Sequence, residues 1–405
     1  MNRTILAAVL LGAAATAALH AAPAMNDTTA IYGDMHPLHK PLHQISFDVT
    51  PNYVFPTRGF LQGEGQSKRP VHSNLAAHLK YGFRFAPDSY FGRLYPYATQ
   101  GIGLAYNTFF HQAEVGSPLA VYVFQNSRIC SLTPRLSLDY EWNFGVSFGW
   151  KEYDEESNPT NEIVGSDMNA YINLNLMLNW CFAPKWHLTA GVGLTHFSNG
   201  NTHYPNYGVN TTGARIGVVR TLGDESMYNH LPRPSFTPYV SYDLIVYGAA
   251  KKKGIYPDGS EWGKLVPGTF GVVGLNFNPM YNVSRHFRTG LSLDMQYDES
   301  ANIAGHIVDP NVNKEDFKFY RPPFIEQIGV GISARAELVM PIFSINIGIG
   351  KNFICKGPDT NKFYQIIALK THFTKRAFLH VGYQLYNFKD PNNLMLGIGY
   401  RFNGK

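Results

Sequence analysis

The sequence predicts an all-β protein, a transmembrane antiparallel up-and-down β-barrel of about sixteen strands, within a range of twelve to sixteen. Composition is the first indication: of 405 residues, 14% are aromatic and only 16% are charged, as in large β proteins and membrane barrels. The second is a set of long segments in which apolar and polar residues alternate. The third is that the connections between these segments are alternately long and short.

The N-terminus predicts export from the cytoplasm. Residues 1–24 have the features of a secretory signal peptide, because Arg3 precedes a compact apolar stretch and small residues suited to signal peptidase. Residues 25–43 are polar and unpatterned, so we expect a periplasmic N-terminal segment there. The barrel is then expected over 44–405. After the first two dozen residues, no apolar run approaches the roughly 18 residues of a spanning helix.

The alternation is clear between residues 170 and 182. Successive side chains of a strand point to opposite faces, and here one face is apolar while the other is largely polar. The apolar face carries Ala170, Ile172, Leu174, Leu176, Leu178, Trp180 and Phe182. Residues 136–150 and 291–297 repeat the pattern. Many segments reach about ten residues, which a tilted strand needs to cross a bilayer.

Sixteen candidate strands can be placed. They start near Ile45, Leu75, Tyr97, Leu119, Leu136, Ala170, Leu188, Thr212, Tyr239, Thr269, Arg288, Gln327, Ile342, Tyr364, Ala377 and Leu394. Outer-membrane barrels have long outer loops and short periplasmic turns. The long connections are 56–73, 151–166, 199–211, 249–266 and 298–325, and the short ones include 183–186, 282–286, 340–341 and 373–375. One connection, 223–235, breaks the alternation because it is too long for a turn.

Charge and cysteine content exclude several partners. The formal net charge is +5, too mild and too dispersed to indicate nucleic-acid binding. The three cysteines are odd in number and show no zinc-binding pattern. The run Lys251–Lys253 lies in a long outer loop and is most simply solvated charge, with lipid phosphates as an alternative contact.

One strand carries residues with catalytic potential. Between residues 187 and 198, the even positions are apolar until His196 and Ser198. Residues two apart share a face of a strand, so these two side chains stand side by side. The preceding turn is short and therefore periplasmic, which makes the strand run outwards. If the even face meets lipid, the pair lies on the barrel exterior near the outer leaflet.

The next strand supplies a third polar side chain. Asn210 has the same parity as the lipid-facing residues of its strand, so we expect it beside His196. His196 would then deprotonate Ser198, and Asn210 would hold the imidazole in the required tautomer. The polar loop offers Asn199, Gly200 and Asn206 as oxyanion-stabilising or substrate-binding groups. For Asn199 and Asn206, the alternative explanation is turn formation, which Asn and Gly favour for local backbone reasons.

The segment His196-Phe197-Ser198-Asn199-Gly200, followed by Pro205-Asn206-Tyr207-Gly208, resembles the lipid A 3-O-deacylase (acyloxyacyl hydrolase) family. That family has a His-x-Ser-Asn motif, a downstream Pro-Asn-x-Gly, and a Glu as third triad member, where this chain has Asn210. The resemblance implies an eight-stranded barrel and hydrolysis without a metal. The spacing to Asn210 is also similar to outer-membrane phospholipase A, which implies twelve strands, calcium and a homodimer.

Two functions of different classes follow. The first is a serine esterase in the outer membrane of a Gram-negative bacterium, acting on an acyl ester of lipid A or of a phospholipid, with no cofactor unless calcium is required as in the phospholipase. The second is a porin or transport barrel, since about sixteen strands can enclose an aqueous lumen. The end of the chain, 397–402, is similar to the signal read by the barrel-assembly machinery, which we expect as a partner.

Overall fold

A computed structural model describes residues 40–225, 232, 234–255, 264–310, 312, 317–388 and 390–403. The predicted signal peptide and most of the predicted periplasmic segment lie outside these residues. The first strand begins at Leu42, so the last two residues of that predicted segment belong to the barrel.

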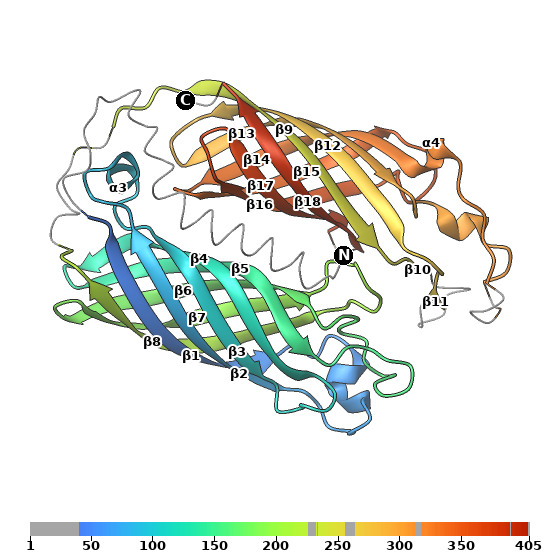
Figure 1. Cartoon of the computed structure of the whole chain (residues 1–405), viewed down its shortest axis with the longest axis horizontal. Helices are drawn as coiled ribbons and strands as arrows, with labels where there is room; N and C mark the ends of the chain where they lie inside the picture. The colour runs from blue at the N-terminus through green and yellow to red at the C-terminus, as the bar shows by residue number, and fades with distance from the viewer. Residues whose placement is uncertain are drawn as a thin grey trace. The chain divides into compact units, whose positions relative to one another are not determined.

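Sixteen long antiparallel strands form two closed barrels of eight strands each (Figure 1). The first barrel consists of β1 (Leu42–Val54), β2 (Ser73–Arg84), β3 (Thr99–Thr108), β4 (Gly116–Thr133), β5 (Leu136–Trp150), β6 (Asn169–Ala183), β7 (Trp186–Ser198) and β8 (Val209–Leu222). The second consists of β9 (Tyr239–Lys251), β12 (Phe270–Asn282), β13 (Phe287–Asp298), β14 (Ile328–Val339), β15 (Phe343–Ile354), β16 (Phe363–His372), β17 (Ala377–Tyr386) and β18 (Asp390–Phe402).

Few other elements occur among the described residues. A two-stranded sheet, β10 (Gly254–Ile255) with β11 (Lys264–Leu265), lies between β9 and β12 in the chain. The short helical segments are η2 (Phe60–Glu64), α3 (Tyr90–Leu94), η5 (Ile303–His306) and α4 (Phe324–Gln327). In the described part of the chain, no helix has the length and apolar character needed to span a membrane.

The all-β class, the antiparallel pairing and the sixteen barrel strands of the prediction are confirmed. Their division into two barrels differs from the single barrel expected over 44–405. The first barrel closes where β1 pairs with β8, with Phe47 opposite Val218. The second closes where β9 pairs with β18, with Val246 opposite Ile398. The long connection near 223–235 is therefore the link between the barrels, which explains why it breaks the alternation of loops and turns.

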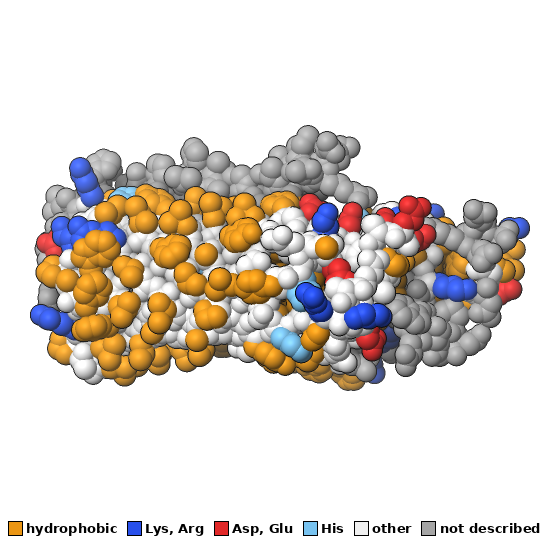
Figure 2. Space-filling model, turned by 90° about the horizontal axis from the view of Figure 1, so that it is seen from below, with side chains coloured by type: hydrophobic (Ala, Val, Ile, Leu, Met, Phe, Trp, Pro, Cys, Tyr) orange, Lys and Arg blue, Asp and Glu red, His pale blue; other side chains and the backbone are white. Residues whose placement is uncertain are grey.

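Apolar side chains cover the exterior of the strands in both barrels. Exposed residues of the first barrel include Phe47, Leu79, Leu104, Leu174, Val192 and Ile216, and those of the second include Val246, Val273, Leu291, Ile332, Ile347 and Ile398. Figure 2 shows apolar side chains spread over much of the visible strand surface, while charged side chains gather nearer its ends. Such an apolar band is what a bilayer-spanning barrel presents to lipid.

The interior of the first barrel is filled by paired charges and aromatic rings. Arg215 contacts Asp48 at 2.7 Å and Glu141 at 2.8 Å. Lys80 contacts the same two carboxylates at 3.1 and 2.8 Å. All four side chains are buried, and Phe197 and other aromatic residues form a buried cluster in the same barrel. An eight-stranded barrel is just wide enough for its side chains to fill the interior.

Replacing Arg215 by Met is expected to destabilise the first barrel by roughly 3–5 kcal/mol, because removing one member of a buried ion network leaves charge uncompensated. Lys80 would then face the carboxylates of Asp48 and Glu141 alone. Urea-induced unfolding in lipid vesicles measures this change. The matched control is Arg135→Met in the exposed β4–β5 turn, and equal stability of the two variants would contradict the structural role of the network.

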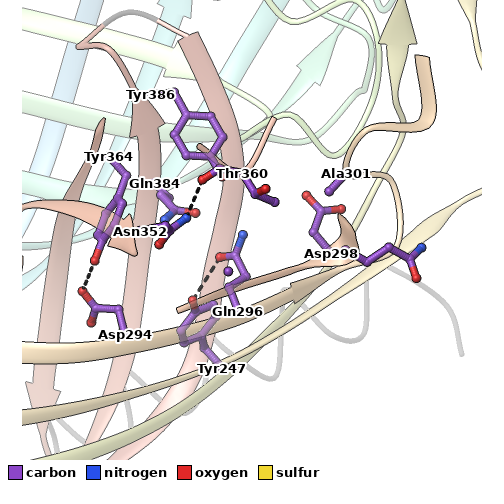
Figure 3. Close-up of a pocket in the computed structure, with 12 residues that line it drawn as sticks. Tyr247, Asp294, Gln296, Asp298, Ala301, Asn352, Thr360, Tyr364, Gln384 and Tyr386 are labelled. Atoms are coloured by element: carbon purple, nitrogen blue, oxygen red, sulfur yellow. Dashed lines mark hydrogen bonds between the residues drawn. The ribbon is translucent and has the colours of Figure 1, made fainter. Parts of the chain in front are cut away.

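The second barrel is also filled, by different residues. Lys370 contacts Asp243 at 2.9 Å and Glu337 at 2.5 Å, and all three side chains are fully buried. Nearer the loops, Figure 3 shows polar side chains around a small cavity of about 20 Å³. There the Tyr364 hydroxyl donates to Asp294 at 2.8 Å, and the Tyr247 hydroxyl donates to Gln296 at 3.0 Å (Figure 3).

Candidate active site

The three predicted catalytic residues lie together at the loop end of two adjacent strands. His196 and Ser198 are at the end of β7, and Asn210 is at the start of β8. The register places His196 directly opposite Asn210. This register comes from the antiparallel pairing of β7 with β8 across the loop 199–208, and it brings residues fourteen apart in the sequence to the same level of the sheet.

Two hydrogen bonds join these side chains into one chain. His196 Nδ1 lies 2.7 Å from Asn210 Oδ1, and His196 Nε2 lies 2.9 Å from Ser198 Oγ. A carboxamide oxygen can only accept, so Nδ1 carries the proton and Nε2 presents its lone pair to the serine hydroxyl. Ser198 therefore donates to His196, and the imidazole is poised to take that proton.

The predicted catalytic trio, His196, Ser198 and Asn210, is on the lipid-facing side of the barrel. On the same face of β7, Val192 and Leu194 are 60% and 56% exposed. Phe197, which lies between His196 and Ser198 in sequence, is 0% exposed and points into the interior cluster. The parity prediction is thus confirmed for the placement of the residues, and their half-buried side chains stand at the rim of an apolar surface.

Gly208 supports the trio from behind, a role that sequence reasoning did not assign. Its φ is +69°, and an added Cβ would lie 2.5 Å from the Phe197 carbonyl oxygen, 3.3 Å from His196 Cε1 and 3.4 Å from Ser198 Cβ. Its backbone N–H donates to the Ile163 carbonyl at 2.9 Å. Only a residue without a side chain allows this close approach.

We expect Gly208→Ala to lower esterase activity by about 10²-fold, since a displacement of about 1 Å is enough to disrupt a catalytic geometry to that extent. The control is Gly268→Ala. Gly268 also has a positive φ, +104°, but no atom lies within 4 Å of an added Cβ. Steady-state hydrolysis of a lipid ester compares the two. An equal loss of activity in both variants would show that backbone strain, and not contact with the trio, causes the loss.

The predicted oxyanion residues belong to the β7–β8 loop, where they also bond to one another. The Asn199 backbone N–H donates to Asn206 Oδ1 at 2.7 Å, and the Asn199 side-chain amide contacts the Pro205 carbonyl at 3.5 Å. Asn199 therefore uses these donors to shape the loop. Gly200 adopts a positive φ of +64°, which gives a bend shortly after the end of β7.

Arg58, a residue that the sequence analysis did not single out, lies against this loop. The Arg58 guanidinium carbon is 3.4 Å from the centre of the Tyr207 ring, next to Gly208. Arg58 comes from the β1–β2 connection, far away in sequence, so only the closure of β1 onto β8 brings it here. The contact packs the β1–β2 connection against the segment behind the predicted catalytic trio.

The sequence predicts that Lys251 is a solvated charge, but the structure buries this side chain. Its side chain is 4% exposed and contacts Asp298 at 2.6 Å. Lys253 contacts Asp359 at 2.9 Å. The run lies at the mouth of the second barrel, where strand ends bring acidic residues from other strands and loops close to it.

Among the described residues, no group of three or more His, Cys, Asp or Glu side chains could hold a metal, and the absence of a cofactor stays a prediction.

Comparison with protein families identifies the chain. The model of the lipid A 3-O-deacylase (PagL) family matches residues 129–219, which include the predicted catalytic trio. The model of the acyloxyacyl hydrolase C-terminal domain matches residues 240–404, the second barrel. The two matches together take in more than half of the chain. The chain belongs to the PagL family. It is an outer-membrane lipid A deacylase, and hence a carboxylic ester hydrolase.

Solved structures similar to this PagL-family chain include small outer-membrane barrels. The crystal structure of the outer membrane enzyme PagL is 14% identical, with a TM-score of 0.29, and covers 43% of this chain and 97% of its own. The Yersinia pestis outer membrane protein Ail is 15% identical, with a TM-score of 0.23, covering 40% of this chain and 99% of its own. No match was found among curated proteins. The family assignment rests on the family models alone.

Proposed function

We propose that Ser198 is the nucleophile of this deacylase, with His196 as general base and Asn210 as the residue that orients the imidazole. The observation that carries the proposal is the pair of hydrogen bonds of 2.9 and 2.7 Å on the lipid-facing side of β7 and β8. A substrate held in the outer leaflet would meet the serine directly, because the apolar strand face leads up to it.

The proposed reaction has two halves. His196 Nε2 takes the Ser198 proton as Oγ attacks the ester carbonyl carbon. The resulting oxyanion would be stabilised by the side-chain amide of Asn206 and the backbone N–H of Gly200. Collapse breaks the ester bond, and the imidazolium gives its proton to the leaving glycolipid hydroxyl. Water, deprotonated by His196, then cleaves the acyl-serine and releases a fatty acid.

The strand face beneath the trio suits an acyl chain. Ile172 is directly opposite His196 on β6, and Leu174 is opposite Leu194. These side chains are 36%, 53% and 56% exposed for Ile172, Leu174 and Leu194. An acyl chain lying along them would stay in an apolar environment while its ester reached Ser198 at the boundary.

The other predicted functions have less support. A porin requires an aqueous lumen, and each barrel of eight strands is filled by buried ion networks in its described part. Cleavage of a glycerophospholipid remains an alternative substrate choice for the same trio, and calcium would accompany it. Recognition by the barrel-assembly machinery and homodimer formation remain expectations.

Mass spectrometry of the products tests the proposal. The purified protein is incubated in mixed micelles with lipid A or with a diacyl glycerophospholipid. We expect lipid A to lose the mass of one acyl chain and free fatty acid to appear in equal amount, without added metal. If only the glycerophospholipid were cleaved, the substrate would be the glycerophospholipid and not lipid A.

Asn210 provides a specific prediction about the third position. Asn210→Glu is expected to retain activity within about tenfold, because a carboxylate can accept the same Nδ1–H hydrogen bond. Asn210→Leu is expected to lose about 10²–10⁴-fold, since the imidazole would no longer be held in one tautomer. Kinetics with a soluble thioester measures both variants. If Asn210→Glu were inactive while Asn210→Leu kept its activity, Asn210 would not orient the imidazole.

A further inference from the structure

The second barrel carries an open groove at its loop end. The groove has a volume of about 620 Å³ and lies between the end of β15, the 355–362 loop and the β17–β18 connection. Its cationic lining residues are Lys351 and Lys362, and its polar lining includes Asn361 and Asn387. No residue of the catalytic mechanism contributes to this lining.

The two lysines stand directly above the lipid-facing surface. Lys351 has the parity of Ile347 and Ile349, which are 52% and 53% exposed on the outside of β15. Its neighbour across the sheet is Phe363, 54% exposed, and the Lys351 ammonium lies 5.1 Å from that ring centre. Apolar side chains therefore lie below the charge, within the membrane, and the groove opens at the headgroup level.

The positive charge of the groove is only partly neutralised. Within the described part of the chain, Lys351 has no carboxylate within ion-pair distance. Lys362 contacts Asp359 at 3.4 Å, but the same carboxylate also contacts Lys253 at 2.9 Å. Burial raises the pKa of Asp359, but the charge and hydrogen bond of Lys253, together with the Asn302 backbone N–H and the charge of Lys362, outweigh burial and hold the pKa at about 2. One ionised carboxylate is thus shared between two lysines.

The groove is held in shape by hydrogen bonds within the second barrel. Asn302 accepts from the Asp359 backbone N–H at 3.0 Å and donates to the Lys356 carbonyl at 2.9 Å. Asn387 donates its backbone N–H to the Phe363 carbonyl at 3.1 Å. Because the loops are fixed before any ligand arrives, little ordering cost is left for binding.

We propose that this groove binds the phosphorylated headgroup of an outer-leaflet glycolipid of the lipid A class. The phosphate would lie between Lys351 and Lys362, and the acyl chains would follow the exposed isoleucines of β15. Lysines act as point charges for phosphate, and an apolar strand face beneath them distinguishes a lipid from a free anion. The second barrel is thereby a lipid-binding module.

The test counts bound lipids by native mass spectrometry. The full-length chain carrying Ser198→Ala is titrated in detergent with bis-phosphorylated lipid A, with dephosphorylated lipid A, or with inorganic phosphate. We expect Lys351→Gln with Lys362→Gln to weaken one lipid A site by about tenfold or more, at roughly 1 kcal/mol per lysine near an anionic lipid. The controls are Lys351→Arg with Lys362→Arg, and Lys356→Gln, whose side chain is 63% exposed and contacts Glu326 instead. Both are expected to bind normally.

Several outcomes would overturn the proposal. Unchanged lipid binding in the double Gln variant would exclude the groove. Equal loss of binding in the Lys356→Gln control would show that the overall charge of the protein, and not the groove, determines lipid binding. Equal affinity for dephosphorylated lipid A would exclude phosphate recognition, and displacement of lipid A by millimolar inorganic phosphate would indicate a free-anion site. Because catalysis is absent from the assay, these results are independent of whether Ser198 is the nucleophile.

Discussion

Ser198→Ala is expected to reduce deacylation of lipid A by about 10⁴–10⁶-fold, while the protein still folds and inserts. Removing the nucleophile of a serine hydrolase leaves only the rate supplied by binding and oxyanion stabilisation. The side chain is half-buried at the end of β7 and its hydroxyl forms a hydrogen bond with His196, so its removal disturbs little packing. Product mass spectra from vesicles containing each variant give the rate.

The matched control is Thr212→Val. Thr212 has the parity of Asn210 on β8 and lies opposite Leu194, and its hydroxyl donates to the Gly193 carbonyl at 3.0 Å. Removing that hydroxyl tests whether any polar group near the rim matters. We expect near-normal activity. An active Ser198→Ala protein, or an equally inactive Thr212→Val protein, would contradict the assignment of the nucleophile.

His196→Gln is expected to cause a loss of similar size. Glutamine can still form hydrogen bonds to Ser198 and Asn210, but it cannot take up a proton between them. Residues of a catalytic unit are strongly non-additive, so the double variant His196→Gln with Ser198→Ala should be no worse than either single variant. Rates for the two single variants and the double variant measure this coupling.

His187→Gln is the control on the same strand. His187 is at the opposite end of β7, where it contacts Asn179 at 3.0 Å and Glu225 at 3.3 Å inside the barrel. We expect this variant to keep its activity. Additive losses in the double variant would mean that His196 and Ser198 act separately, and the proposed proton transfer between them would then be wrong.

Local periodicity explains why much of the fold and site was predictable. Each strand's alternation of apolar and polar residues depends only on neighbours in the sequence, and all sixteen expected starts lie within a few residues of an observed strand. The same parity placed His196, Ser198 and Asn210 on one face, and the hydrogen bonds of the trio agree with that expectation. β7 and β8 are consecutive in the chain and pair antiparallel, so even their mutual register is a contact between neighbouring strands.

Long-range closure explains most of what the sequence could not predict. Whether sixteen strands close once or twice depends on the pairing of β1 with β8 and of β9 with β18, which no local pattern encodes. The unusually long connection near residue 223 was the only signal of the division. The burial of Lys251 against Asp298 and the approach of Arg58 to Tyr207 have the same cause, since each joins separate strands or loops.

The most direct test of the account is covalent labelling of the nucleophile from the membrane. The protein in lipid vesicles is treated with a long-chain alkyl fluorophosphonate, which reacts with an activated serine, and the modified peptide is sequenced by mass spectrometry. The account predicts one adduct, on Ser198, that is absent in Ser198→Ala and at least about 10²-fold slower to form in His196→Gln. Labelling of a different serine, or full lipid A deacylase activity after Ser198 has been modified, would contradict it.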